Sequence, residues 1–291
     1  MRKLLFFLTF IGLPFFISAQ TFLKAPKDSK HIKQIIEWTT FAADETDPEE
    51  TVKEGVYTFR RDGQLLQYVT NNSLSEVFDY EYDGQNRLLK VQIKNEESTK
   101  TMTYQYFADR RMAEIYEPDS DLRTIQYFNK KGQVVEEKAF WKGKLSDGKW
   151  ATLNRTVFNY NDRDSLFGEM LYQIGSTGAV ATYKTIHLYD PVTNKKSDII
   201  YKEPDGKPNK LVSFQYDEQG RLVKKKIEMP LTGEKSVTDY IYQKGKLWQS
   251  ITKGKNYRNE KIYKDGRLIR SKDFDRDGKL LWHTDYQYVF Y

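Results

Sequence analysis

Hydrophobic and polar positions alternate along short stretches of this chain, and the stretches are separated by turn-forming residues. Aromatic residues recur two positions apart, as at Tyr80 and Tyr82 or at Phe214 and Tyr216. Residues at i and i+2 share one face of a β-strand, and aromatic side chains suit a pleated surface. The residues between them, such as Glu81, are mostly polar. The pattern therefore predicts strands with one aromatic face and one wet face.

A short motif accompanies this alternation and marks the turns. It consists of an aromatic residue, Asp and polar residues, Gly or Asn, a basic residue or Gln, and two apolar residues. The clearest copies lie at 59–66, 82–89, 128–135 and 216–223. Shorter or degenerate copies bring the number to ten, with turn positions at 63, 86, 110, 132, 164, 194, 220, 245, 266 and 278. Most of these positions hold Gly or Asn, which predicts left-handed backbone and tight hairpins.

Ten hairpins predict an all-β fold of roughly twenty strands. One hairpin is marginal in water, so neighbouring hairpins must pair. We expect repeated antiparallel β-hairpins that form an extended or coiled meander sheet, solenoid-like in character. A long meander, a sheet coiled on itself and an open solenoid all fit the repeat.

The chain divides into three predicted parts. Residues 1–19 form a signal peptide, residues 20–54 form a lead-in strand with an acidic loop, and residues 55–291 form the repeat domain. Within the lead-in, residues 29–40 suit a helix by their Ile spacing, and a strand equally by their β-branched content. The acidic stretch at 43–51 is predicted to be a loop.

The signal peptide follows from the first twenty residues. Arg2 and Lys3 precede an uncharged apolar run from Leu4 to Ile17, and small residues follow, with cleavage after Ala19 or Gln20. That run is shorter than the ~20 residues that a membrane span needs. We therefore expect an exported chain in the periplasm, at the cell surface or outside the cell. No later stretch approaches membrane length, so we expect no membrane span after signal cleavage.

Composition narrows the chemistry. The 291 residues include no Cys and 3 His, with 47 Lys+Arg against 41 Asp+Glu. The absence of Cys excludes disulfides, thiol catalysis and zinc–thiolate sites. The positive and negative residues are interspersed, so no basic stripe of the nucleic-acid-binding kind is present, and we expect no nucleic-acid partner.

The motifs at 82–88 and 216–222, with Tyr189 and Asp190, resemble the tyrosine–aspartate (YD, or Rhs-type) repeat family. The unit at 263–268 is similar to the MORN-like variant of antitoxin-type repeat proteins. The resemblance covers about residues 55–288 and implies an all-β repeat protein, with no catalytic residue carried over. The signal peptide and Tyr-rich repeats are also similar to small exported proteins of Bacteroidetes-type bacteria.

The one metal-site pattern is at 273–278. Asp273, Asp275 and Asp277, followed by Gly278, match the first half of a calcium loop. Thr284 stands where such a loop needs its bidentate Glu. The same residues are also the tenth repeat turn. Calcium is therefore the one cofactor that the sequence suggests, and the turn is the competing interpretation.

Two tryptophans, Trp141 and Trp150, fall in the least regular insertion and are the predicted ligand-binding residues. Exposed aromatic side chains stack on sugar rings or enter a protein partner. No acid pair, and none of His31, His187 and His283, stands in a recognisable catalytic motif.

We therefore expect a non-enzymatic, exported module that binds a protein or a cell-surface polysaccharide. The alternative is a carbohydrate-binding or carbohydrate-processing protein that uses exposed Trp or Tyr and carboxylates. The aromatic C-terminus would suit an outer-membrane barrel, but three consecutive lysines at 224–226 argue against lipid-facing strands.

Overall fold

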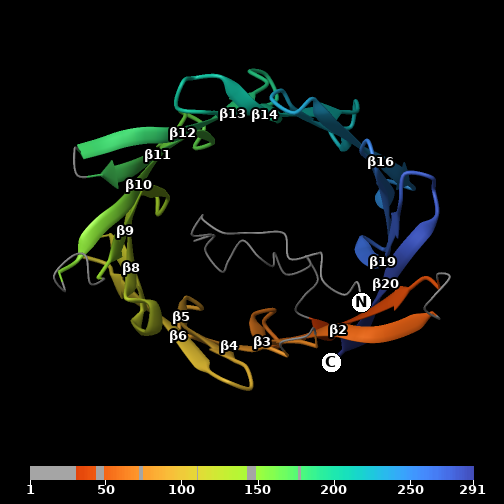
Figure 1. Ribbon diagram of the computed structural model, residues 1–291, viewed down its shortest axis with the longest axis horizontal. Coiled ribbons are helices and arrows are strands. Elements are labelled where there is room, and N and C mark those ends of the chain that lie inside the picture. The colour runs from red at the N-terminus through yellow and green to blue at the C-terminus, as the bar shows by residue number, and fades with distance from the viewer. Residues whose placement is uncertain (1–30, 44–48, 72–74, 110, 143–148, 176–177) are drawn as a thin grey trace.

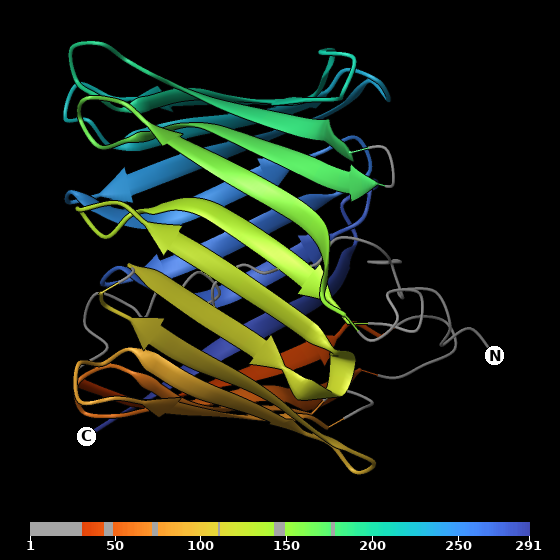
Figure 2. The ribbon, with the colours of Figure 1, turned by 90° about the vertical axis from the view of Figure 1, so that its left-hand side faces the viewer.

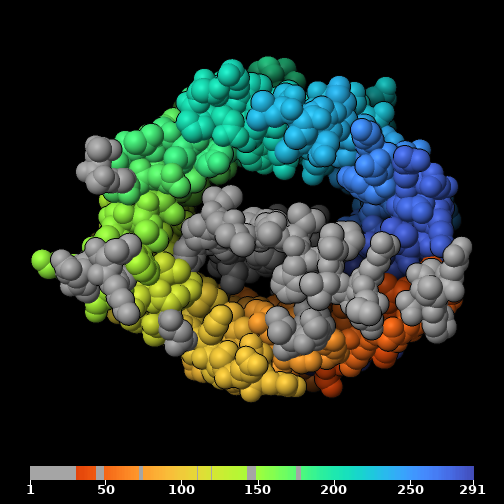
Figure 3. All heavy atoms as spheres, in the orientation of Figure 1, coloured from red at the N-terminus to blue at the C-terminus, as the bar shows by residue number. Residues whose placement is uncertain are grey.

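The computed structural model describes residues 31–43, 49–71, 75–109, 111–142, 149–175 and 178–291. The predicted signal peptide, Arg110 and the middle of the acidic loop lie outside these residues. The chain forms a ring of strands around a central hollow (Figure 1), and the space-filling view shows the wall continuous around it (Figure 3). Within the described ranges, no helix is long and apolar enough to cross a membrane.

Twenty strands and one short 3₁₀ helix make up the described fold. They are β1 (Ile32–Phe41), β2 (Glu50–Phe59), β3 (Leu65–Thr70), β4 (Val77–Tyr82), β5 (Leu88–Lys94), β6 (Thr99–Phe107), β7 (Met112–Glu117), η2 (Pro118–Ser120), β8 (Leu122–Phe128), β9 (Val134–Trp141), β10 (Ala151–Tyr160), β11 (Leu166–Gly175), β12 (Gly178–Tyr189), β13 (Lys196–Lys202), β14 (Pro208–Tyr216), β15 (Leu222–Met229), β16 (Glu234–Gln243), β17 (Lys246–Lys253), β18 (Arg258–Lys264), β19 (Arg267–Phe274) and β20 (Leu280–Phe290).

The all-β prediction is confirmed, but the predicted extended or coiled, solenoid-like sheet is wrong. Each strand pairs antiparallel with the next one in sequence, and β1 also pairs antiparallel with β20. The strands run at a slant across the wall (Figure 2). A sheet of this many coiled strands brings its two edges together, and pairing them removes both open edges. The result is a closed antiparallel barrel.

The closure between β1 and β20 is packed as well as hydrogen-bonded. Register pairs run from Ile32 with Phe290 to Phe41 with Trp282. Beside this seam, Ile32, Ile35 and Phe59 form a buried hydrophobic cluster. Tyr57, Leu65, Tyr286 and Tyr288 pack against that cluster. The residues predicted as either helix or strand at 29–40 therefore supply a strand, β1, that closes the barrel.

The turn prediction is confirmed wherever the structure describes it. Positive φ values occur at nine of the ten predicted positions, for example 63° at Asn86 and 74° at Gly220. The tenth is Arg110.

Because successive connections of an antiparallel meander alternate between its two ends, the turn at Gly278 lies at the opposite rim from the turn at Gly266. The turn at Glu203–Lys207, where Gly206 has φ 82°, was not among the predicted turns.

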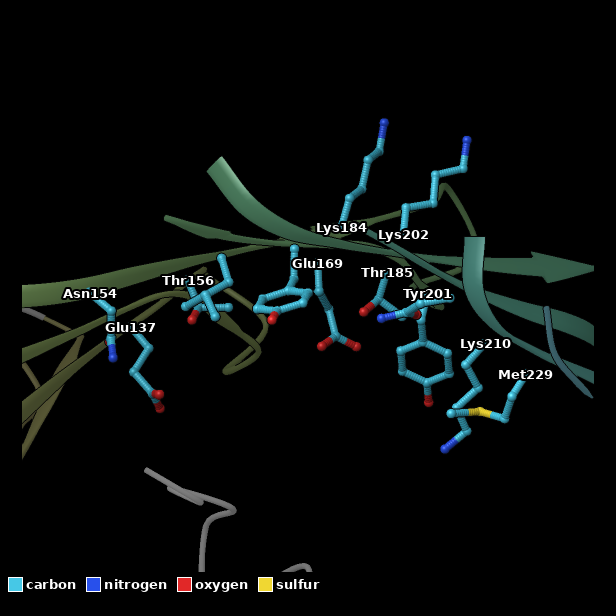
Figure 4. A pocket seen from close by; sticks show the side chains of 13 residues that line it. Glu137, Asn154, Thr156, Glu169, Lys184, Thr185, Tyr201, Lys202, Lys210 and Met229 are labelled. Carbon is cyan, nitrogen blue, oxygen red and sulfur yellow. The ribbon is translucent and has the colours of Figure 1, made fainter. Parts of the chain in front are cut away.

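Register places the two faces of every strand on opposite sides of the wall. Figure 4 shows Glu169, Tyr201 and Lys210 pointing to the hollow side, and Lys184 and Lys202 pointing away from it. We call these sides the inner wall and the outer wall. Following the cross-strand pairs around the barrel places the motif tyrosines on the inner wall, together with the buried Val91, Ile115 and Val212.

The outer wall carries cross-strand ion pairs. Lys94 Nζ lies 2.9 Å from Asp79 Oδ2, and Lys90 Nζ lies 3.1 Å from Glu81 Oε1. Further outer-wall pairs join Arg123 to Glu114, Arg155 to Glu136, Lys224 to Asp239 and Arg270 to Asp285. The predicted aromatic and wet faces are therefore the inner and outer walls, respectively.

Candidate functional site

A cavity of about 420 Å³ opens on the inner wall between β9 and β15. Its lining combines carboxylates, tyrosine rings, amides and an ammonium group (Figure 4). The lining includes Glu137, Thr156, Glu169, Tyr183, Tyr201, Asn209 and Lys210. A concave site with a few convergent polar groups is the usual form of a ligand site.

Strand register brings these residues together from distant parts of the sequence. Glu137 on β9 is paired with Thr156 on β10, and Leu171 on β11 is paired with Tyr183 on β12. Thr185 on β12 is paired with Tyr201 on β13, which is paired in turn with Lys210 on β14. Neighbouring strands are ~4.8 Å apart, so the pairs form two adjacent rows of side chains across the wall. One row runs from Glu137 to Tyr183, and the other runs from Glu169 to Lys210.

A chain of hydrogen bonds supports the middle of the cavity. His187 Nε2 lies 2.7 Å from Glu169 Oε1, and Lys196 Nζ lies 3.1 Å from His187 Nδ1. With the lysine donating to Nδ1, the Nε2–H of the imidazole is directed at the carboxylate. Burial lowers the pKa of Lys196, and the Glu169 carboxylate opposes that shift. The histidine, 8% exposed, therefore fixes the position of Glu169.

Glu137 forms the acidic edge of the cavity. Gln126 Nε2 donates a hydrogen bond to Glu137 Oε2 over 2.8 Å. Burial nevertheless raises the pKa of Glu137, because desolvation disfavours the charged carboxylate more than this bond favours it.

Lys210 and Asn209 form the opposite edge. The Lys210 ammonium lies 5.1 Å from the centre of the Tyr201 ring, within the distance of a cation–π contact. Asn209 Nδ2 donates to Glu203 Oε1 over 2.6 Å, while Asn209 Oδ1 is buried and accepts no hydrogen bond. The cavity thus has the Glu137 carboxylate at one edge, the Glu169 carboxylate and tyrosine rings in the middle, and the Lys210 ammonium at the other edge, beside a buried amide oxygen without a partner.

The predicted ligand-binding tryptophans lie outside this cavity. Trp141 ends β9, and Trp150 precedes β10. Both are partly exposed, and Trp150 packs edge-on against the outer-wall Tyr116, with ring centres 6.0 Å apart. Ligand binding by the two tryptophans stays a prediction.

The three aspartates of the calcium pattern have separate partners. Asp275 Oδ1 accepts hydrogen bonds from the backbone N–H groups of Asp277 and Lys279, both over 2.9 Å. Asp273 Oδ1 accepts one from Asn259, also over 2.9 Å. Across the part of the chain that the structure describes, no three acidic or histidine side chains converge as metal ligands would. Asp275 therefore acts as a turn cap, and calcium binding stays a prediction.

Glu169, Tyr201 and Lys210 were not among the residues predicted from the sequence. None of these residues lies in a repeat turn or in a chemical motif. One available signal was the insertion around 140–150, which interrupts the repeat just before β10. A second available signal was the alternation along the strands. It puts polar residues such as Glu137 and Glu169 on the face where other repeats carry aromatic or aliphatic side chains.

No protein-family model matches the sequence, and no curated protein matches it. A solved complex of the Tc toxin components TcdB2 and TccC3 with Cdc42 matches at 13% identity and a TM-score of 0.28. That match covers 80% of this chain and 16% of the toxin chain, so this chain spans about a sixth of its length.

Two porin-like proteins also match. The one from Bacteroides uniformis is 12% identical, with a TM-score of 0.37 and coverage of 89% of this chain and 96% of its own. The one from Bacteroides vulgatus is 10% identical, with a TM-score of 0.36 and coverage of 89% and 98%. With TM-scores this low, the fold rests on the strand pairings of the chain itself.

Proposed function

We propose that this chain is an exported, non-enzymatic barrel that binds a segment of a cell-surface polysaccharide against its inner wall. The observation that supports this best is the cavity between β9 and β15, in which Glu169, Tyr183 and Tyr201 lie between Glu137 and the Asn209–Lys210 edge. Tyrosine offers an apolar ring face and a polar tip, which suits the two faces of a sugar ring. Carboxylate and amide oxygens accept hydrogen bonds from sugar hydroxyls.

A polymer fits this site better than a compact small molecule. The cavity is one part of a wall that continues around the hollow of the barrel (Figure 3). A chain of sugars extending from the cavity would meet further tyrosines of the repeats, such as Tyr104 and Tyr240. Repeated weak contacts of this kind add up along a chain.

The proposed compartment is the aqueous part of the cell envelope. Lipid-facing strands carry apolar side chains, and charges near the middle of the bilayer cost about 2–4 kcal/mol each. The outer wall instead carries ion pairs such as Lys94 with Asp79 and Arg123 with Glu114. Together with the predicted signal peptide, these charges support a barrel that stands in water after export. The purified chain should remain in the aqueous fraction when mixed with lipid vesicles and floated.

Membership of the tyrosine–aspartate repeat family is part of the proposal. Asp217 Oδ1 accepts the backbone N–H of Arg221 over 2.8 Å, and the Arg221 guanidinium lies 4.6 Å from the Tyr242 ring of the next repeat. Asp83, Arg87 and Tyr106 repeat this arrangement. The motif residues therefore have structural roles, in keeping with a repeat family that specifies architecture.

Binding can be measured by titrating the chain with envelope polysaccharide fractions, using affinity electrophoresis and then calorimetry. Tyr201→Ala should weaken binding about fivefold, because it removes one ring contact. Tyr172→Ala is the matched control, since Tyr172 lies on the outer wall beside Arg155. Equal effects of the two substitutions would contradict an inner-wall site. Loss of binding only in Trp141→Ala or Trp150→Ala would move the site to those tryptophans.

Carbohydrate processing is the second candidate, and one observation favours it. The raised pKa of Glu137 is the property that a general acid for glycoside cleavage needs. Release of reducing sugar from a bound polysaccharide, abolished by Glu137→Gln, would establish the enzyme. Binding without release, retained in Glu137→Gln, would leave the binding function alone.

A further inference from the structure

We propose that the Lys210 edge of the cavity is a subsite for an anionic group on the bound sugar, so that the ligand is an acidic polysaccharide. This inference rests on the proposed polysaccharide-binding function and names the class of polymer. It follows from the charges of the inner wall and from one unused hydrogen-bond acceptor.

The position of Lys210 is fixed by its neighbours. It pairs with Tyr201 on β13, and its ammonium lies over that ring at 5.1 Å. Its other neighbour is β15, where Met229 also borders the cavity (Figure 4). Tyr201 and Met229 therefore leave the ammonium facing the space that a ligand would fill.

Among the residues that the structure describes, no carboxylate forms an ion pair at this edge. On the outer wall, Lys90 and Lys94 each lie within 3.1 Å of a carboxylate oxygen. Lys210 and Lys225, both on the inner wall, form no ion pair with any described carboxylate. Burial lowers the pKa of Lys225, and the charge of Lys210 lowers it further. Two ammonium groups that repel each other on a partly desolvated wall are stabilised by an anion placed between them.

Asn209 indicates that the anion is carried by a sugar rather than being a free ion. Its Oδ1 is buried without a hydrogen-bond partner, and its Nδ2 is already engaged by Glu203. A free sulfate has no hydrogen to donate to this acceptor, whereas a sugar hydroxyl next to the anionic group can donate to it. A free phosphate can donate through its own P–OH group, so it is included as a competing ligand in the test. An ammonium beside a hydroxyl acceptor matches the carboxylate and adjacent hydroxyl of a uronic acid.

The test compares two polymers that have the same sugars and differ at the carboxyl group, which is free and charged in one and a neutral methyl ester in the other. Oligogalacturonate and its fully methyl-esterified form have the same sugar backbone, and each is titrated into the chain by calorimetry at low and moderate salt. We expect the acidic form to bind at least tenfold more tightly than the ester. Lys210→Met should remove that preference, because the charged contact is lost while the aliphatic stem stays. Lys225→Met should reduce it in part, and Lys90→Met on the outer wall should leave it unchanged.

The outcomes separate this inference from the function on which it rests. Equal binding of acid and ester, unaffected by Lys210→Met, would overturn the anion subsite and keep the polysaccharide function. Binding of inorganic phosphate as tightly as the acidic oligomer would overturn the sugar assignment. Failure of both oligomers to bind, with native circular dichroism, would overturn uronate recognition, while binding of other envelope polysaccharides would show that the function itself survives.

Discussion

The hydroxyl of Tyr216 donates a hydrogen bond to the backbone carbonyl of Lys196, 2.9 Å away in the preceding repeat. Lys196 is the first residue of β13, directly after the turn of that repeat. Equivalent bonds of 2.8–3.0 Å recur around the barrel, at Tyr82 to Leu65, Tyr160 to Val134, Tyr189 to Leu166, Tyr242 to Leu222 and Tyr288 to Leu268. At these six positions, the tyrosine therefore connects its strand to the hairpin before it.

Tyr216→Phe should lower the free energy of unfolding by about 1 kcal/mol. The ring and its packing stay, but the carbonyl of Lys196 loses its side-chain donor, which is worth about 0.5–1.5 kcal/mol. Chemical denaturation followed by circular dichroism measures the change. Tyr172→Phe on the outer wall is the control and should have almost no effect. A loss as large in Tyr172→Phe would mean that the bond is not the cause.

Gly220→Ala should destabilise the barrel by about 1 kcal/mol or more, because Gly220 has φ +74° and an alanine in left-handed backbone is strained. A Cβ there would also displace the flexible end of Lys195. Gly84→Ala provides the comparison, since Gly84 lies in an equivalent turn with open space around it and without positive φ. Thermal melts of both variants should separate them, and equal melting temperatures would argue against backbone strain at Gly220.

Phe59→Ala should cost about 3–5 kcal/mol, the usual range for removing a fully buried phenyl ring. Phe59 is 1% exposed and packs with Ile32 and Ile35 beside the seam between β1 and β20. Phe167→Ala tests the same substitution at a side chain that is 45% exposed, and it should cost far less. Urea unfolding of the two variants gives the comparison. Similar losses would show that the seam is not a main source of stability.

At alkaline pH, ionisation of the inner-wall tyrosines should be coupled to unfolding of the barrel. Burial raises the pKa of Tyr80, of Tyr82 and of Tyr104 to about 12, above the ordinary value near 10. The unfolded chain therefore loses these protons first, and the free energy of unfolding falls as pH rises from about 10 to about 12. Tyrosinate absorbance and circular dichroism should change together in that window. Complete ionisation near pH 10 with native circular dichroism would contradict this burial.

Local features of the fold were predictable from the sequence because they depend on neighbouring residues. Positive φ at a turn such as Asn86 follows from the residue type, and the aromatic inner wall follows from spacing. Closure was not predictable in this way. It requires β1 to pair with β20. The hydrophobic pattern of an edge strand is the same whether or not a second strand is hydrogen-bonded to its free edge.

The candidate site was beyond sequence reasoning for a related reason. Glu137, Glu169, Tyr201 and Lys210 come from four different strands, and only the lateral pairing of β9 to β14 brings them together, in two adjacent rows. The two tryptophans were chosen because they interrupt a pattern, whereas the cavity residues fit the strand pattern. The cavity residues differ from the pattern only in being polar on the aromatic face of their strands. That difference indicates a site only once it is known that the aromatic face lines the hollow of the barrel.

The seam has one more consequence, for how the barrel comes apart. In an open repeat array, the first and last repeats have a single neighbour, so they fray and need capping units. Here β20, the last strand, pairs antiparallel with β1, the first strand, and Ile35 lies opposite Tyr288. Every strand therefore has two neighbours, and there is no end from which to unravel. The barrel should lose its structure in a single cooperative step rather than repeat by repeat.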